Sequence, residues 1–178
     1  MEERSIFLSP SAQEYNIGFG DFGSEEYRMN RIADIVEKLL REKGYIVYRN
    51  NPNDSLSEIV EESNKLSPDI HVAIHSNASG GNYQGRGPEI YASRPNTSSS
   101  RLANAIYDEI IKIYPEPELG RGVLYNQNLY EIRETLAPAV LLEVAFHDNE
   151  LDAKWIMENE NEIAEAIVRG IELYFSEI

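Results

Sequence analysis

The run DIHVAIHSNA at residues 69–78 and the run AVLLEVAFHDN at residues 139–149 decide the fold of this chain. Both are short, apolar and rich in β-branched residues, which is the pattern of a buried strand. Each run also carries an ionisable side chain, His75 in the first and Glu143 in the second. Such groups are costly to bury unless they are paired, hydrogen-bonded or bound to a metal. The two residues therefore indicate a site at a sheet edge where a metal ligand and a carboxylate converge.

Helical patterns alternate with short apolar segments along the rest of the chain. Apolar residues at helical spacing, with Ser24 as N-cap and Gly44 as stop, predict a helix over residues 24–43. The other predicted helices span residues 56–66, 98–114, 150–157 and 160–175. The predicted strands span residues 6–8, 45–48, 70–76, 89–92 and 140–146, with short edge strands at 122–125 and 129–132. We therefore expect an α/β fold, an open and mostly parallel twisted sheet of about six strands with helices on both faces.

Composition narrows the classes of function. A chain of 178 residues with 42% hydrophobic content is long enough for one domain and short for two, so we expect a single domain over residues 1–178. A formal net charge of -15 disfavours binding to nucleic acid or to an anionic membrane surface. Because the chain has no cysteine, any metal must be held by nitrogen and oxygen ligands.

Targeting signals are not evident. Residues 1–10 contain too few apolar residues for a signal peptide, and no later stretch is long enough to span a bilayer. We therefore expect cytoplasmic synthesis without membrane insertion. The sequence leaves the oligomeric state open.

His71 and His75 share the spacing of a zinc-binding helix, but the run that holds them is β-branched. In a strand, residues four apart lie roughly 13 Å from each other and do not share one metal ion. His75 lies at the carboxyl end of its strand, where open α/β sheets place their sites. We therefore assign His75 to the site and His71 to the core, as a structural histidine with its polar atoms satisfied.

Glu143 is flanked by apolar residues on both sides. Burial raises the pKa of a carboxylate unless a cation or a metal offsets it, and a raised pKa suits a general base. The alternative is a buried ion pair with Arg133 or Arg121. The polar residues 147–149 that follow the strand favour the interpretation as a site.

Acidic residues begin the helix at residue 24. Glu25 and Glu26 suit the dipole of the first turn, which by itself accounts for them. The loop before this helix offers further oxygen ligands to a site containing His75, namely Gln13, Glu14 and Asp21.

The segment GFGDFG at residues 18–23 matches the dinucleotide-binding pattern G-x-G-x-x-G and precedes a helix. In that fold, however, the glycines follow the first strand directly, whereas here residues 9–17 intervene. The second predicted strand also ends at Tyr48-Arg49-Asn50 rather than in an acid. A nucleotide-binding domain therefore remains only a weaker alternative.

Taken together and in this order, several segments resemble the zinc-dependent N-acetylmuramoyl-L-alanine amidases of the Amidase_3 type, which occur in autolysins, sporulation hydrolases and phage endolysins. Residues 74–78 are similar to the family's histidine-bearing strand end, and residues 140–149 to the segment with its catalytic glutamate. Residues 26–30 resemble the start of the family's helix that carries a glutamate ligand. Residues 121–123 and 129–138 resemble the segments that lead into the family's last strand. The resemblance covers nearly the whole chain.

The resemblance implies a hydrolase that degrades bacterial peptidoglycan. It implies that His75 and Glu26 bind Zn²⁺ and that Glu143 takes a proton from the attacking water and returns it to the leaving amine. The scissile bond would be the amide between N-acetylmuramic acid and L-alanine, and Asn77 and Arg121 would contact the substrate. The protein would act on the cell wall, reaching it by lysis or another route.

One departure concerns the histidine that the family places just after its first strand. Here the corresponding residues 9–14 read SPSAQE, with no histidine. Gln13 is our candidate for the third metal ligand, with Glu14 or His147 as alternatives. The missing histidine also leaves a second function open, a catalytically silent module that binds peptidoglycan.

Overall fold

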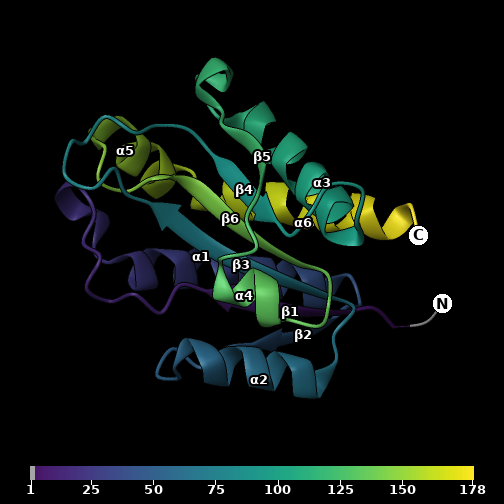
Figure 1. Ribbon diagram of the computed structural model, residues 1–178. Coiled ribbons are helices and arrows are strands. Elements are labelled where there is room, and N and C mark those ends of the chain that lie inside the picture. The colour runs from purple at the N-terminus through teal and green to yellow at the C-terminus, as the bar shows by residue number, and fades with distance from the viewer. Residues whose placement is uncertain (1–2) are drawn as a thin grey trace.

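The sheet has six strands in the order β2-β1-β3-β6-β4-β5 (Figure 1). The structure is a computed structural model, and it describes residues 3–178. The strands are β1 (Ser5–Pro10), β2 (Ile46–Arg49), β3 (Ile70–Asn77), β4 (Glu89–Ala92), β5 (Gly122–Tyr125) and β6 (Ala139–Phe146). β4 pairs with β6 antiparallel and all other pairs are parallel. The predicted α/β fold with a mostly parallel sheet is confirmed.

Helices cover both faces of this sheet. They are α1 (Glu25–Glu42), α2 (Leu56–Leu66), α3 (Ser98–Ile113), α4 (Tyr130–Glu134), α5 (Glu150–Glu158) and α6 (Glu160–Ser176), with 3₁₀ turns η1 (Gly20–Phe22) and η2 (Pro117–Leu119). The main apolar core joins one face to α1, α3, α5 and α6. A smaller cluster on the other face lies beneath α4. Within the described residues, no helix is both long and apolar enough to cross a membrane.

The start of α1 follows the predicted capping. The Ser24 hydroxyl accepts a hydrogen bond from the Tyr27 backbone N–H at 3.0 Å. After the last turn, Gly44 adopts a φ of 89°, a left-handed conformation that favours glycine. This cap fixes where the first turn of α1, and with it Glu25, meets the sheet.

The predicted edge strand at residues 129–132 is wrong, because this segment forms the short helix α4. A strand would turn the neighbouring residues Glu131 and Ile132 to opposite sides, whereas both are buried here. Glu131 reaches His71, and Ile132 joins the small apolar cluster. A helix of five residues is too short for its periodicity to show in the sequence.

His71 has the buried environment that was expected of a structural histidine. Its ring stacks on Phe7 with the centroids 5.0 Å apart. Its Nδ1 lies 2.8 Å from the Ser63 hydroxyl of α2, and its Nε2 lies 2.7 Å from the Glu131 carboxylate of α4. His71 therefore fastens two helices to the sheet face that also carries His75.

Glu160 links the start of α6 to α1 and yields a prediction on stability. Its buried carboxylate contacts Arg28 Nη1 at 2.6 Å and Arg31 Nη2 at 2.9 Å. Burial alone would raise the pKa of Glu160, but the two arginines outweigh it and lower the pKa below the ordinary value. The stabilisation is therefore full above about pH 4.5 and is lost as the pH falls through the lower folded-state pKa.

We expect Glu160→Gln to cost about 3 kcal/mol of unfolding free energy at pH 7. The difference from wild type should shrink as the pH falls through the lowered folded-state pKa of Glu160 and the carboxylate is protonated in the folded chain too. Thermal unfolding of both proteins over a series of falling pH values measures this. Glu165→Gln, an exposed glutamate on the same helix, is the control. A pH-independent difference would contradict the argument.

Candidate active site

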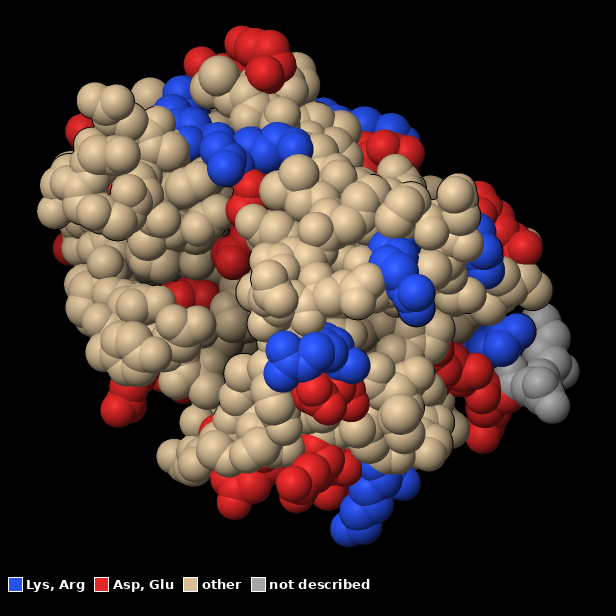
Figure 2. Space-filling model, in the orientation of Figure 1, with Lys and Arg blue, Asp and Glu red and all other residues tan. Residues whose placement is uncertain are grey.

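A cleft of about 1030 Å³ opens at the carboxyl ends of β1, β3 and β6. Figure 2 shows a hollow on the viewed face of the molecule, with acidic side chains visible inside it. Strands β4 and β5, which run opposite to the others, begin at this same edge. The cleft therefore collects residues from β1, β3, β4 and β6, from the loop between β1 and α1, and from the residues on either side of β5.

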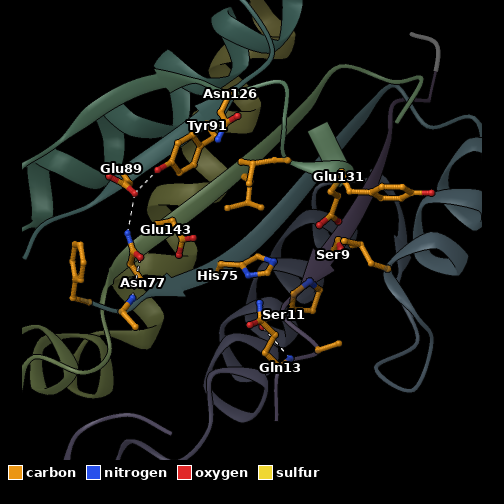
Figure 3. Close-up of a pocket in the computed structure, with 18 of the residues that line it drawn as sticks. Ser9, Ser11, Gln13, His75, Asn77, Glu89, Tyr91, Asn126, Glu131 and Glu143 are labelled. Atoms are coloured by element: carbon orange, nitrogen blue, oxygen red, sulfur yellow. Dashed lines mark hydrogen bonds between the residues drawn. The ribbon is translucent and has the colours of Figure 1, made fainter. Parts of the chain in front are cut away.

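Three ionisable residues form a row across the floor of the cleft (Figure 3). His75 on β3 lies directly opposite Glu143 on β6, and Glu143 lies opposite Glu89 on β4. Directly opposed residues of neighbouring strands point to the same face of a sheet. The register thus places an imidazole between the β1 loop and two carboxylates, as the strand pattern predicted for His75 and Glu143.

The carboxylate that contacts His75 is that of Glu25. Its Oε1 lies 2.9 Å from His75 Nδ1, and the residue is only 2% exposed. Glu26, which was expected as a metal ligand, is the next residue of α1 and is only half-buried. One step along a helix turns a side chain by about 100°. The structure therefore brings Glu25, rather than Glu26, to His75.

Gln13 joins this pair through a residue that sequence reasoning missed. The Asn16 side-chain nitrogen donates to Gln13 Oε1 at 2.6 Å and to Glu25 Oε2 at 2.8 Å. Asn16 therefore holds an amide oxygen and a carboxylate in one network beside His75. Glu14 is exposed. His147 is buried, and its Nδ1 is engaged by the Ser76 hydroxyl at 2.8 Å.

The pKa values of the central pair depart strongly from their ordinary range. Burial raises the pKa of Glu143 to about 8, with the nearby carboxylates of Glu25 and Glu89 adding to the rise. Burial would lower the pKa of His75, but Glu25 and Glu143 outweigh it and raise the pKa to about 9. Within the described residues, Glu143 Oε2 is buried and has no hydrogen-bond partner. Neither arginine proposed as its ion-pair partner contacts it, because Arg121 pairs with Glu89 and Arg133 with Glu134.

The two residues expected to bind substrate converge on Glu89. Asn77 Nδ2 donates to Glu89 Oε1 at 2.8 Å, and Arg121 Nε donates to Glu89 Oε2. The Tyr91 hydroxyl also donates to Oε1, and its pKa rises to about 12 through burial and this bond. Figure 3 shows Asn77 and Tyr91 turned towards Glu89. Glu89 was not predicted as a site residue, because an acid beside a turn ordinarily faces water.

The donors beside His75 fit a zinc ion only if an amide takes part. Within residues 3–178, no group of three His, Cys, Asp or Glu side chains is placed to hold a metal. His75 and Glu25 supply one nitrogen and one oxygen donor in mutual contact. Gln13 supplies a further oxygen through the Asn16 network. A nitrogen and two oxygens are chemically suited to Zn²⁺, and the Glu143 carboxylate lies on the neighbouring strand.

Comparison with known proteins decides the family. The model of the Amidase_3 family, described as N-acetylmuramoyl-L-alanine amidase, matches residues 6–173. The chain belongs to the Amidase_3 family. It is therefore a member of an enzyme family of cell-wall amidases, and this assignment displaces the nucleotide-binding alternative that rested on residues 18–23. In the structure those residues form a closed loop, in which the Gly18 N–H bonds the Gly23 carbonyl at 2.9 Å.

Relatives of this Amidase_3 domain come from several bacteria. An uncharacterized cell wall amidase of Bacillus anthracis is 37% identical over 145 residues, which are 77% of this chain and 27% of that protein. The solved amidase AmiC2 of Nostoc punctiforme has a TM-score of 0.86 at 23% identity, covering 97% of both chains. The catalytic domain of CwlV from Paenibacillus polymyxa has a TM-score of 0.84 at 25% identity, covering 97% of this chain and 98% of that one. The chain spans 60% or less of the length of the curated relatives it matches.

Proposed function

We propose that this chain is a zinc-dependent N-acetylmuramoyl-L-alanine amidase that cleaves the amide between N-acetylmuramic acid and L-alanine in bacterial peptidoglycan. Residues 1–178 would form one catalytic domain acting at the cell wall. The observation that carries the proposal is the Glu143 carboxylate next to the His75–Glu25 pair in the cleft, because its buried Oε2 has no hydrogen-bond partner in the part of the chain that the structure describes. The family assignment supports the substrate class.

His75, Glu25 and Gln13 would hold the metal. Asn16 donates to Glu25 Oε2, while Glu25 Oε1 faces His75 and also accepts from the Ser76 backbone N–H at 3.4 Å. The second hydrogen bond of Asn16 ties the Gln13 amide oxygen into the same network. When bound, zinc supplies a Lewis acid that polarises the scissile carbonyl and stabilises negative charge on its oxygen. An amide oxygen is a weaker ligand than the imidazole it replaces, so we expect weaker binding than in a site with two histidines.

Glu143 is the proposed general base. Its Oε2 takes a proton from the water that attacks the carbonyl carbon, and the carboxylic acid then gives that proton to the departing nitrogen of L-alanine. A pKa of about 8 suits this exchange near neutral pH, because the group both accepts and releases a proton there. Asn77 and Arg121 would hold the substrate on the other side of Glu143, where both contact Glu89.

One observation favours a second function, that of a silent peptidoglycan-binding module. In the described part of the chain, only two of the strong zinc donors meet, since no third His, Cys, Asp or Glu joins His75 and Glu25. Such a module would keep the cleft but would bind cell wall without releasing product.

Removing and restoring the metal separates the two functions. We expect the purified protein to release muropeptides with new L-alanine amino termini, to lose this activity after chelation and to regain it with about one equivalent of zinc. Mass spectrometry of digested peptidoglycan identifies the bond cut. Sedimentation with intact sacculi measures binding in the same samples. Binding without cleavage at excess zinc would establish the silent module instead.

A further inference from the structure

Among residues 3–178, Arg121 is the single arginine or lysine that lines the cleft. The described lining residues include no lysine and no other arginine, but they include four acids, Asp54, Glu89, Glu131 and Glu143. The whole chain carries a net charge of -15. An anionic group entering such a cleft is repelled unless a local cation meets it. On the β4–β5 side of the cleft, Arg121 thus offers a negatively charged group a permanent positive charge.

The position of Arg121 is fixed from three sides. Its backbone N–H donates to the Pro88 carbonyl at 2.9 Å, just before β5 pairs with β4. Its Nε donates to the buried Glu89 carboxylate, and its guanidinium lies over the Phe146 ring, 5.4 Å from the centroid. Ordering of this kind reduces the entropy that a flexible side chain loses when it binds a ligand.

The outer edge of the guanidinium remains available. The Arg121 side chain is 47% exposed. Its hydrogen bond within residues 3–178 is made by Nε, so Nη1 and Nη2 are free to donate into the cleft. The Glu89 oxygens are already engaged by Asn77, Tyr91 and Arg121. Two parallel N–H groups form the fork that binds a carboxylate bidentately. The site is therefore built for a planar anion.

We propose that Arg121 binds the α-carboxylate of the second residue of the peptide stem and so sets a preference for stems in which that carboxylate is free. This inference rests on the proposed amidase function. In peptidoglycan, L-alanine is followed by a glutamate linked through its side chain, whose α-carboxyl group is either free or amidated. The anion is therefore a carboxylate, and the competing neutral ligand is the corresponding amide.

The spacing of the strands agrees with this assignment. Glu143, Glu89 and Gly122 are directly opposed on β6, β4 and β5, so the start of β5 lies two strand spacings from Glu143, roughly 10 Å. An extended peptide advances about 3.5 Å per residue, which puts a group two residues from the scissile amide about 7 Å away. The guanidinium reaches back towards β4, where Glu89 holds it. A stem crossing from β6 to β5 therefore brings its second residue to Arg121.

Two muramoyl dipeptides test the proposal. They are N-acetylmuramoyl-L-alanyl-D-glutamate, with a free α-carboxylate, and N-acetylmuramoyl-L-alanyl-D-isoglutamine, its amide. We expect kcat/KM of the wild type for the acid to exceed that for the amide by about 10- to 100-fold. In Arg121→Gln the ratio should fall to about one. Arg101→Gln removes the same charge from exposed α3 and should keep the wild-type ratio.

Calorimetry of both ligands with the Glu143→Gln variant separates the carboxylate site from the amidase function. Suppose that the wild type cleaves neither ligand, but that the acid binds more tightly than the amide and Arg121→Gln abolishes this preference. In that case the carboxylate site stands and the amidase function fails. If both ligands are cleaved at equal kcat/KM by the wild type, the amidase stands and this proposal is overturned. Equal binding of acid and amide, with or without cleavage, likewise overturns it.

Discussion

Glu143→Gln should lower the rate of amide cleavage by about a thousandfold while leaving the zinc content unchanged. A neutral amide cannot take the proton from the attacking water, and loss of a positioned general base typically costs this much. The substitution keeps the size of the side chain, so the cleft should retain its shape. Initial rates on a muramoyl-L-alanyl substrate, with metal analysis of each preparation, measure the effect.

The fold itself should not suffer from Glu143→Gln. Glu143 Oε2 is buried and has no hydrogen-bond partner among residues 3–178, so its burial does not favour the folded state. We therefore expect an unfolding temperature equal to or above that of the wild type. Glu134→Gln, an exposed glutamate of α4, is the matched control and should retain full activity. Near-normal cleavage by Glu143→Gln would remove this residue from the mechanism.

Glu25→Gln should weaken zinc binding by at least about a hundredfold, whereas Glu26→Gln should leave it nearly unchanged. Loss of a residue that merely orients a ligand already costs 10- to 100-fold in affinity, so the loss of a charged ligand costs at least as much. Glu25 contacts His75, and Glu26, its neighbour on α1, is half-buried. Competition with a chromogenic chelator measures both affinities without relying on activity.

The two variants carry the same change of charge in the same turn of α1, so the helix dipole and the net charge are controlled. Equal losses in both would mean that the effect is electrostatic rather than one of ligation. A loss confined to Glu26→Gln would restore the assignment made from the sequence and contradict the one made from the structure.

The sheet was predictable because its central strands carry unmistakable patterns. The apolar runs at 70–76 and 140–146 have the pattern of buried strands. Because residues four apart in a strand are too distant to share a metal ion, the pattern also assigned His75 to the site and His71 to the core. The strand pattern failed at residues 129–132, where one turn of helix and a short strand leave similar patterns. Tertiary contacts decide there, since Glu131 is drawn inward by His71 of β3.

The site was predictable only where a strand revealed it. His75 and Glu143 stood out because ionisable groups are rare in apolar strands. The choice between Glu25 and Glu26 was not available from the sequence, since both acids suit the first turn of a helix. Asn16 lies in an irregular loop, and Glu89 becomes informative only once the register sets it opposite Glu143. Position in three dimensions, rather than residue type, identifies these two.

The most direct test of the proposed centre is a crystal structure of the zinc-loaded protein with anomalous data at the zinc edge. The account predicts one zinc ion at about 2.0–2.2 Å from His75 Nδ1, Glu25 Oε1 and Gln13 Oε1, with Glu143 beside the open position. Zinc held by Glu26, Glu14 or His147, or no zinc in the cleft at saturating concentration, would contradict it.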